Sequence, residues 1–259
     1  ESEDFEVTHG LVMPALYGMR ARRYMHDYGL TKEELAGVAV KAHKHGAKNV
    51  DAQYRNIVTI EEVMQAREIA EPFTLLHCCP SGDGAAAVLI ASVDKARQYT
   101  REPIHVACSE VNSGKYMTGY RDMTTPEITV RGAKYAYEEA AIGPEDVDVA
   151  EVHDAFTIAE LLYYEALGFC EKGDAAKLLR SGDTSIGGQI PVNPSGGLLS
   201  KGHPIGATGA AQIVEVVRQL RGQCGNRQVE GAKVGLTHCT GGGISGFDHG
   251  ACSIHIFTV

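Results

Sequence analysis

Glycine is concentrated in the last third of the chain, where a long glycine-rich stretch runs from Ser181 to Gly209. It accounts for 30 of the 259 residues, whereas soluble proteins usually contain about 7% glycine. Clustered glycine indicates backbone held in unusual conformations or brought close to a ligand. A long irregular stretch inside a compact domain is usually functional. We therefore expect this stretch to carry part of a functional site.

Helices and strands alternate on both sides of the glycine-rich stretch. Capping boxes, in which a threonine precedes a glutamate by three residues, mark two helix starts at Thr31 and Thr59. The predicted helices cover 11–29, 31–45, 59–69, 94–99, 126–141, 153–168, 175–179 and 210–220. The predicted strands cover 85–91, 104–111, 147–152, 233–238 and 251–257. This order predicts an α/β fold with a mixed sheet.

Composition excludes several classes of protein. Hydrophobic residues make up 44% of the chain and charged residues 22%, which is ordinary for a globular protein. A net charge of −9 argues against nucleic acid as a partner, and no apolar run is long enough to predict a membrane span. The seven cysteines show neither disulfide-framework nor CxxC spacing, so we expect free thiols and no metal site. With no signal peptide, the expected location is cytoplasmic.

The segment EVHDAF, residues 151–156, lies where a predicted strand meets a helix. His153 and Asp154 both leave the strand there, at the kind of position where α/β proteins place active-site residues. The alternative is that Asp154 caps the helix and His153 is a surface residue.

The segment NPSGGLLSKGHPIGATG, residues 193–209, holds His203 between glycines and before Pro204. A histidine on such a rigid loop, just before a helix, suits a general base near neutral pH. The alternatives are a tight loop with an incidental histidine, or a phosphate cradle, although the G-x-x-x-x-G-K-[ST] pattern is absent.

The segment THCTGGGISG, residues 237–246, follows a predicted strand. Backbone N–H groups in its glycine turn suit a developing oxyanion, and Cys239 beside them could transfer a proton. The alternative is a buried cysteine at the end of a strand. A cysteine and histidine pair with a glycine turn indicates acyl-thioester chemistry.

Together these segments resemble the thiolase superfamily. GHPIGATG resembles the histidine-bearing GHP-x-GxTG motif, CTGGG resembles the loop with the acid/base cysteine, and HDAF resembles the sterol-carrier-type and archaeal version of the NEAF motif. LLHCCPSGDGAAAVLIAS and HKHGAKNVDAQYRN also resemble that acetyl-CoA acyltransferase branch. The resemblance implies the layered αβαβα thiolase fold. It implies a loop region at residues 1–80, the end of the first half at 81–120 and a complete second half at 121–259.

The resemblance assigns four catalytic residues. His203 would activate the nucleophilic cysteine and line the first oxyanion site. Cys239 would abstract the Cα proton in condensation and protonate the leaving enolate in cleavage. Gly241 would donate its N–H to the second oxyanion hole, and His153 would replace the asparagine that positions a water in the first.

The nucleophilic cysteine has no counterpart among the seven, so the resemblance implies a chain lacking the amino-terminal part that carries it. Coenzyme A would be substrate or product, with no permanently bound cofactor. Cys79, Pro80 and Ser81 would lie near its pantetheine channel. The candidate cations for its phosphates are Arg20, Arg22, Arg23, Lys41, Lys44 and Arg55, among which Arg55 is the one we assign to the binding site.

The implied activity is CoA-dependent cleavage of a 3-ketoacyl-CoA or the reverse Claisen condensation. The alternatives are a thiolase-fold retro-aldolase acting on a side-chain acyl-CoA and a non-catalytic scaffold subunit. The implied partners are an acyl-CoA, at least one further copy of the chain and a small subunit with an OB-fold and a zinc ribbon, with neither nucleic acid nor membrane.

Overall fold

The computed structural model describes residue 8 and residues 12–115, 121–242 and 249–259. Its main sheet has four strands in the order β3 (His105–Ser113), β6 (Ala251–Thr258), β5 (Val234–Gly241) and β4 (Val149–Glu151). The β3–β6 and β6–β5 pairs are antiparallel, and the β5–β4 pair is parallel. The predicted mixed sheet is therefore confirmed.

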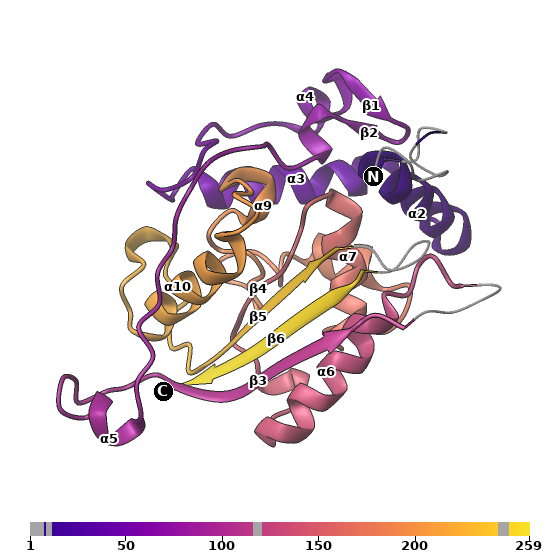
Figure 1. Ribbon diagram of the computed structural model, residues 1–259. Helices are drawn as coiled ribbons and strands as arrows, with labels where there is room; N and C mark the ends of the chain where they lie inside the picture. Colours follow the sequence, from indigo (N-terminus) through magenta and orange to yellow (C-terminus); the bar gives the residue numbers. More distant parts are fainter. Residues whose placement is uncertain (1–7, 9–11, 116–120, 243–248) are drawn as a thin grey trace.

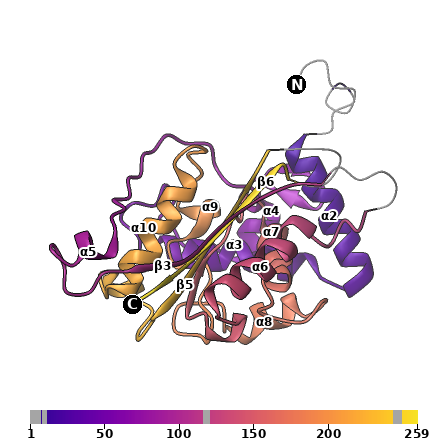
Figure 2. The same ribbon diagram turned by 60° about the horizontal axis from the view of Figure 1, so that its bottom comes forward.

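Helices cover both faces of this sheet. Helix α10 (Thr208–Leu220) lies on one face, and α6 (Glu127–Ala140) and α7 (Thr157–Ala166) lie on the other, as Figure 2 shows. Packing is close on both faces. A Cβ at Gly132 of α6 would lie 3.3 Å from the Ile254 side chain, and one at Gly235 of β5 would lie 2.4 Å from Val216. Small residues thus let both helices approach the sheet.

The amino-terminal region crosses the end of the sheet as a layer of helices (Figure 1). It contains α2 (Met13–Tyr28), α3 (Lys32–Gly46), α4 (Ile60–Gln65) and the hairpin of β1 (Glu68–Ala70) and β2 (Phe73–Thr74). Both predicted capping boxes are confirmed, at Thr31 with Glu34 and at Thr59 with Glu62. The remaining elements are α5 (Val93–Ala96), α8 (Ala175–Ser181), α9 (Gly197–Ser200) and the 3-10 turns η1 (Leu75–His77), η2 (Pro144–Asp146) and η3 (Gly225–Arg227).

The largest hydrophobic core joins this helical layer to the sheet. Leu35 of α3, Tyr24 of α2, Leu161 of α7 and Ile254 of β6 all belong to it and are essentially inaccessible. A second, smaller cluster lies under α10, around Val216. The residues of the amino-terminal region therefore share one core with the main sheet.

The strand predicted over 85–91 is wrong. This apolar segment runs extended past α10 without strand pairing, and Leu89 and Ile90 are 97% and 80% exposed. An apolar run of this length predicts burial, but no described strand lies beside it to bond its backbone. The strand at 105–113, by contrast, forms the edge of the main sheet and so packs with the residues that follow it.

Several helix boundaries also differ from the predictions, two of them by four residues. The helix starting after Thr59 ends at Gln65 because Ala66 turns extended and the chain enters β1. The helix expected from His153 begins at Thr157, so the residues of HDAF are buried and non-helical.

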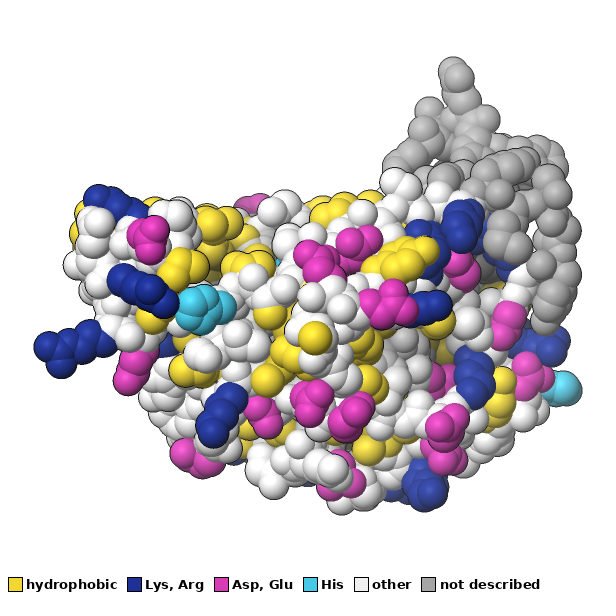
Figure 3. Space-filling model, turned by 90° about the horizontal axis from the view of Figure 1, so that it is seen from below, with side chains coloured by type: hydrophobic (Ala, Val, Ile, Leu, Met, Phe, Trp, Pro, Cys, Tyr) yellow, Lys and Arg dark blue, Asp and Glu magenta, His cyan; other side chains and the backbone are white. Residues whose placement is uncertain are grey.

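The surface seen from below carries interspersed acidic and basic side chains with hydrophobic ones between them (Figure 3). In the described part of the chain, no helix is long and apolar enough to cross a membrane.

Candidate active site

Two of the three motifs singled out from the sequence meet at one place, and the third lies against the start of the helix that follows His203. The ring of His153 stands edge-on to the ring of His203, with the centroids 5.0 Å apart. The extended segment after η1 contacts both motifs. The Cys79 N–H donates to the carbonyl of Ala155 at 2.9 Å, and the backbone of Ser81 forms an isolated β-bridge with that of His203. The predicted neighbours Cys79, Pro80 and Ser81 therefore lie beside both histidines.

His203 lies on an irregular loop directly before α10. Its Nδ1 atom is 2.7 Å from the hydroxyl of Thr208, the first residue of that helix. Burial and the nearby charge of Lys201 lower the pKa of His203. The imidazole is therefore in its neutral form near pH 7, as a general base must be.

Cys239 lies near the end of β5, against the start of α10. A Cβ at Gly209 would be 3.8 Å from the Cys239 sulfur. The next residue upstream is anchored to the same helix, because the Gln212 amide donates to the carbonyl of His238 at 3.1 Å. Burial raises the pKa of Cys239 to about 11, so the resting side chain is a neutral thiol.

Gly241 is the last residue of β5 and is exposed. Gly242 follows with a φ of +66°, so the chain turns immediately after Gly241 in a conformation that favours glycine. Residues 243–246 of the same motif lie outside the described residues.

His153 and Asp154 are buried, so the alternative of a surface histidine and a helix cap is wrong. Phe156 occupies the N-cap position of α7 and makes no side-chain cap bond. Asp154 instead accepts the Leu198 N–H at 2.7 Å. Burial lowers the pKa of His153 to about 3, and burial and nearby Glu160 raise the pKa of Asp154 to about 8. Both side chains are thus held largely uncharged at neutral pH.

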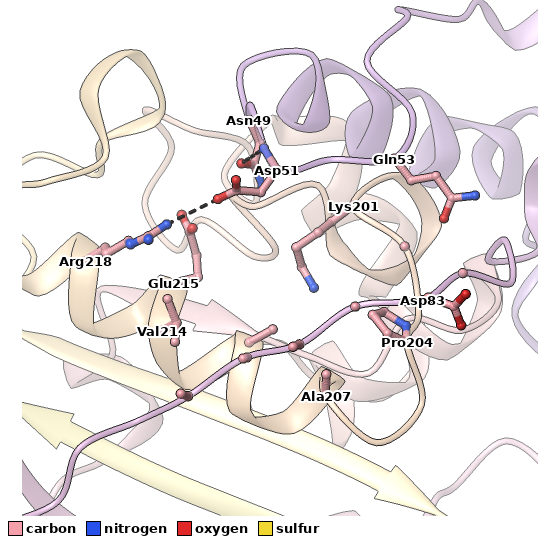
Figure 4. Close-up of a pocket in the computed structure, with 17 residues that line it drawn as sticks. Asn49, Asp51, Gln53, Asp83, Lys201, Pro204, Ala207, Val214, Glu215 and Arg218 are labelled. Carbon is pink, nitrogen blue, oxygen red and sulfur yellow. Dashed lines mark hydrogen bonds and ion pairs between the residues drawn. The ribbon is translucent and has the colours of Figure 1, made fainter.

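Lys201 is a central residue that the sequence reasoning missed. Its ammonium points into a cavity of about 830 Å³ between α10 and the extended segment 82–87 (Figure 4). Its charge contributes to the lowered pKa of His153 and of His203, and it opposes the rise in the pKa of Cys239. A lysine is usually a solvated charge, and only its position two residues before His203 could have singled it out.

The end of α3 holds the glycine-rich loop through buried side chains. Lys41 pairs with Glu160 at 2.7 Å and donates to the carbonyl of Val192 at 3.0 Å. His45 donates from Nδ1 to the carbonyl of Asn193, and its Nε2 accepts the Ile186 N–H. This network was not foreseen, although HKHGAKN stood out as a segment.

Two of the cations considered for CoA phosphates are wrong. Lys41 is 5% exposed and occupied by Glu160, and Arg20 is 2% exposed and donates to the carbonyl of Met123. Neither can reach a phosphate at the surface. The exposed candidates are Arg22, Arg23, Lys44 and Arg55.

Burial keeps six of the seven cysteines protonated. It raises the pKa of Cys78 and Cys239 to about 11 and that of four others to about 12; these four are Cys79, Cys108, Cys170 and Cys224. Among the residues the structure describes, no group of three or more His, Cys, Asp or Glu side chains could hold a metal ion. The site is thus a set of acid–base groups without an activated thiolate among these six.

Two family models divide the chain between them. The model for the thiolase N-terminal domain matches residues 4–94, and the model for the thiolase C-terminal domain-like family matches residues 109–248. The second match covers more than half of the chain. This chain belongs to the thiolase family. The fold and family expected from the motifs are therefore confirmed.

The curated thiolase relatives are similar along most of this chain. Benzoylsuccinyl-CoA thiolase subunit BbsB of Thauera aromatica is 50% identical over 93% of the chain and 63% of its own length. Acetyl-CoA acetyltransferase of Methanothermobacter thermautotrophicus is 46% identical over 99% and 66%. Sterol carrier protein 2 of Bos taurus is 40% identical over 89% and 44%. The chain thus spans at most about two-thirds of the length of these relatives.

Two solved structures share this thiolase fold. The Ltp2-ChsH2(DUF35) aldolase superimposes with a TM-score of 0.81 at 29% identity, over 96% of this chain and 65% of its own. A monomeric SCP2-thiolase-like protein type 1 from Mycobacterium smegmatis gives a TM-score of 0.69 at 20% identity, over 96% and 52%. The second likeness concerns the fold alone.

Proposed function

We propose that this chain supplies the acid–base residues of an active site that cleaves a 3-ketoacyl-CoA with CoA, or forms one by Claisen condensation. The observation that carries this proposal is that His153 and His203 meet with their ring centroids 5.0 Å apart, while Cys239 lies against Gly209 at the start of the helix that follows His203. Membership of the thiolase family and relatives named as thiolases support a CoA thioester as substrate.

In cleavage, a cysteine thiolate attacks the 3-keto carbon, and His203 holds the proton taken from that thiol. The bond between C2 and C3 then breaks, and its electron pair leaves as the enolate of acetyl-CoA. The thiol of Cys239 protonates that enolate. The CoA thiol gives its proton to the Cys239 thiolate and attacks the acyl-enzyme carbonyl; the thioester bond to the enzyme breaks, and the released cysteine takes back its proton from His203. A neutral thiol with a pKa of about 11 is the form that this proton transfer requires.

The remaining assigned residues would stabilise charge. In this proposal the Gly241 N–H faces the enolate oxygen, and His153 lies beside His203 at the first oxyanion site. A buried histidine with a pKa of about 3 stays neutral, so it can orient a water or donate one hydrogen bond without adding charge. The attacking cysteine is not one of the six thiols that burial keeps protonated.

Coenzyme A would enter along Cys79, Pro80 and Ser81, which border the two histidines. Arg55 is exposed and lies on the same loop as Gln53. The Gln53 amide donates to the Ser81 carbonyl at 3.3 Å. This arrangement supports Arg55 as one cation for the CoA phosphates.

A retro-aldolase is the second candidate, favoured by the likeness to a solved aldolase at 29% identity. Cys239 favours the thiolase, because an aldolase needs no thiolysis machinery. The presence of both His203 and Cys239 also argues against a non-catalytic scaffold.

Further subunits belong to the proposal. One relative is named as a subunit and one solved structure combines an aldolase with a DUF35 protein, which supports a second subunit here. The small OB-fold, zinc-ribbon subunit, the homo-oligomer and the cytoplasmic location remain predictions.

The test is an assay of the protein with a panel of 3-ketoacyl-CoA substrates, with and without free CoA, followed by separation of the CoA products. A thiolase yields acetyl-CoA and a shortened acyl-CoA only when CoA is present. Cleavage of a 3-hydroxyacyl-CoA to a ketone or aldehyde without CoA would establish the aldolase instead. Absence of both reactions in the complete assembly would leave the scaffold.

A further inference from the structure

We propose that Thr208 acts as a positioning residue that holds His203 in the tautomer with its proton on Nδ1 and with Nε2 free to accept one. The Thr208 hydroxyl lies 2.7 Å from Nδ1 of His203 and 3.0 Å from the carbonyl oxygen of Pro204. The side chain is completely buried, so water does not compete for either contact.

The hydroxyl has one proton to donate and lone pairs that can accept. The Pro204 carbonyl can only accept, and it takes the threonine proton beside the N–H groups of Ala207 and Thr208, as in the back-bonding of a threonine to the carbonyl four residues earlier. The lone pairs of the hydroxyl are then left for His203, whose Nδ1 must donate. A neutral imidazole carries one proton, and therefore Nε2 is bare.

Nε2 is also the ring nitrogen that faces no partner. Among the described residues, nothing hydrogen-bonds to it. The groups that surround the ring are the edge-on imidazole of His153, the ammonium of Lys201 and the backbone at Ser81. Thr208 makes the hydrogen bond to a ring nitrogen of His203, so we assign the choice of tautomer to it.

The Thr208 hydroxyl, at the start of α10, contacts the loop that precedes the helix. Ala207 is the N-cap of this helix and makes no side-chain cap bond, and the Thr208 hydroxyl turns back to the preceding loop instead. Because the helix packs on the sheet, this contact connects the orientation of His203 to a rigid element. For the proposed thiolysis, a bare Nε2 is the form that can accept the nucleophile's proton, and this consequence rests on the proposed function.

The experiment labels the protein with ¹⁵N-histidine and reads the tautomer of His203 from its two ring-nitrogen shifts at neutral pH, with the signal assigned through His203→Asn. We expect a protonated Nδ1 and a bare Nε2 in the wild-type protein and in Thr208→Ser. In Thr208→Val, which keeps the shape and removes the hydroxyl, we expect a mixture of tautomers and a kcat about five- to tenfold lower at little-changed KM.

Thr129→Val is the matched control, because its hydroxyl lies 2.9 Å from a different histidine, His238. It should leave the His203 signal unchanged. A protonated Nε2 in the wild-type protein, or an unchanged tautomer in a folded Thr208→Val, overturns the proposal. The wild-type spectrum decides the assignment even if that variant fails to fold. The expected tautomer in a protein without thiolase activity would uphold the role of Thr208 and refute the proposed function.

Discussion

Burial sets the protonation states of the individual residues at the candidate site. His153 is 7% exposed and Asp154 is inaccessible, and burial lowers the pKa of the first and raises that of the second. Desolvation penalises the charged form of every group, which leaves neutral acids and bases facing one another. Proton transfer among such groups needs no large change in net charge.

Replacing the thiol of Cys239 tests its assigned role. We expect Cys239→Ser to lower kcat by at least about 10², because a hydroxyl is a much weaker acid than a thiol and general acid–base catalysis contributes on this scale. KM should change little, since the group acts on a proton during the reaction. Steady-state kinetics on a 3-ketoacyl-CoA measures both, and unchanged turnover would refute the role.

Gly197 tests how closely the glycine-rich loop approaches the site. Its φ is +59°, and an added Cβ would lie 2.1 Å from a buried oxygen of Asp154. We expect Gly197→Ala to cost at least about 3 kcal/mol in urea unfolding, since strain and a clash add. Gly222 has a φ of +66° but open space around it, so Gly222→Ala should cost only about 1 kcal/mol. Equal costs would show that the clash relaxes.

Among the secondary-structure elements, α3 and the glycine-rich loop depend on each other. Helix α3 presents Lys41 and His45 to the backbone of residues 184–195, and Asn49, in the turn after the helix, donates to the carbonyl of Ser195 at 2.8 Å. A loop rich in glycine has few side chains with which to order itself. The helix therefore supplies the hydrogen bonds that the loop cannot make internally.

Removing the charge of Lys41 should destabilise the packing of α3 against the glycine-rich loop. Lys41→Met leaves Glu160 buried without its cation, and breaking one side of a buried pair typically costs about 3–5 kcal/mol. We expect a loss of that size in the free energy of unfolding by urea. The control is Lys44→Met on the same helix, an exposed position where the change should stay within about 0.5 kcal/mol.

His45 gives this contact a pH dependence. Burial lowers the pKa of His45 from 6.5 to about 3. Between these two pH values the unfolded chain binds a proton at His45 and the folded chain does not. The stabilisation is complete above pH 6.5 and is lost progressively as the pH falls toward 3. His45→Gln should flatten the decline of stability by up to about 1.4 kcal/mol per pH unit over this range.

Unfolding free energies measured from pH 7 to pH 4 check this prediction. His26→Gln is the control, because His26 is an exposed histidine whose removal should leave the slope unchanged. An equal slope in His45→Gln and the wild-type protein would contradict the assignment.

For the molecule as a whole, the protonated thiols limit what this chain can do. Burial raises the pKa of six cysteines to about 11 or 12, which leaves almost no thiolate at pH 7. We expect the 259-residue chain assayed alone to show no CoA-dependent cleavage of a 3-ketoacyl-CoA. Activity should appear when a further segment with a cysteine at a helix N-terminus is supplied, either fused to this chain or as a second chain. Full activity of the chain alone would make one of its own cysteines the nucleophile.

Local signals in the sequence were sufficient for most helices and for the identity of the motifs. The capping boxes at Thr31 and Thr59 are contacts between residues three apart, so the sequence contains both partners. The segment 85–91 could not be assigned in this way, because a strand exists only when another strand lies beside it.

The sequence by itself determined the family, the α/β class and the residue types His153, His203 and Cys239, because these depend on short spacings and local conformational preferences. Only the tertiary structure decided which groups are charged, which cations are buried and which side chains orient the loop. The residues next to Lys41 and Lys201 in the sequence do not distinguish these two lysines. In the structure, Lys41 pairs with Glu160 in the core and Lys201 points into the cavity. The physical reason is that desolvation and pairing depend on neighbours more than a hundred residues away, which no local pattern specifies.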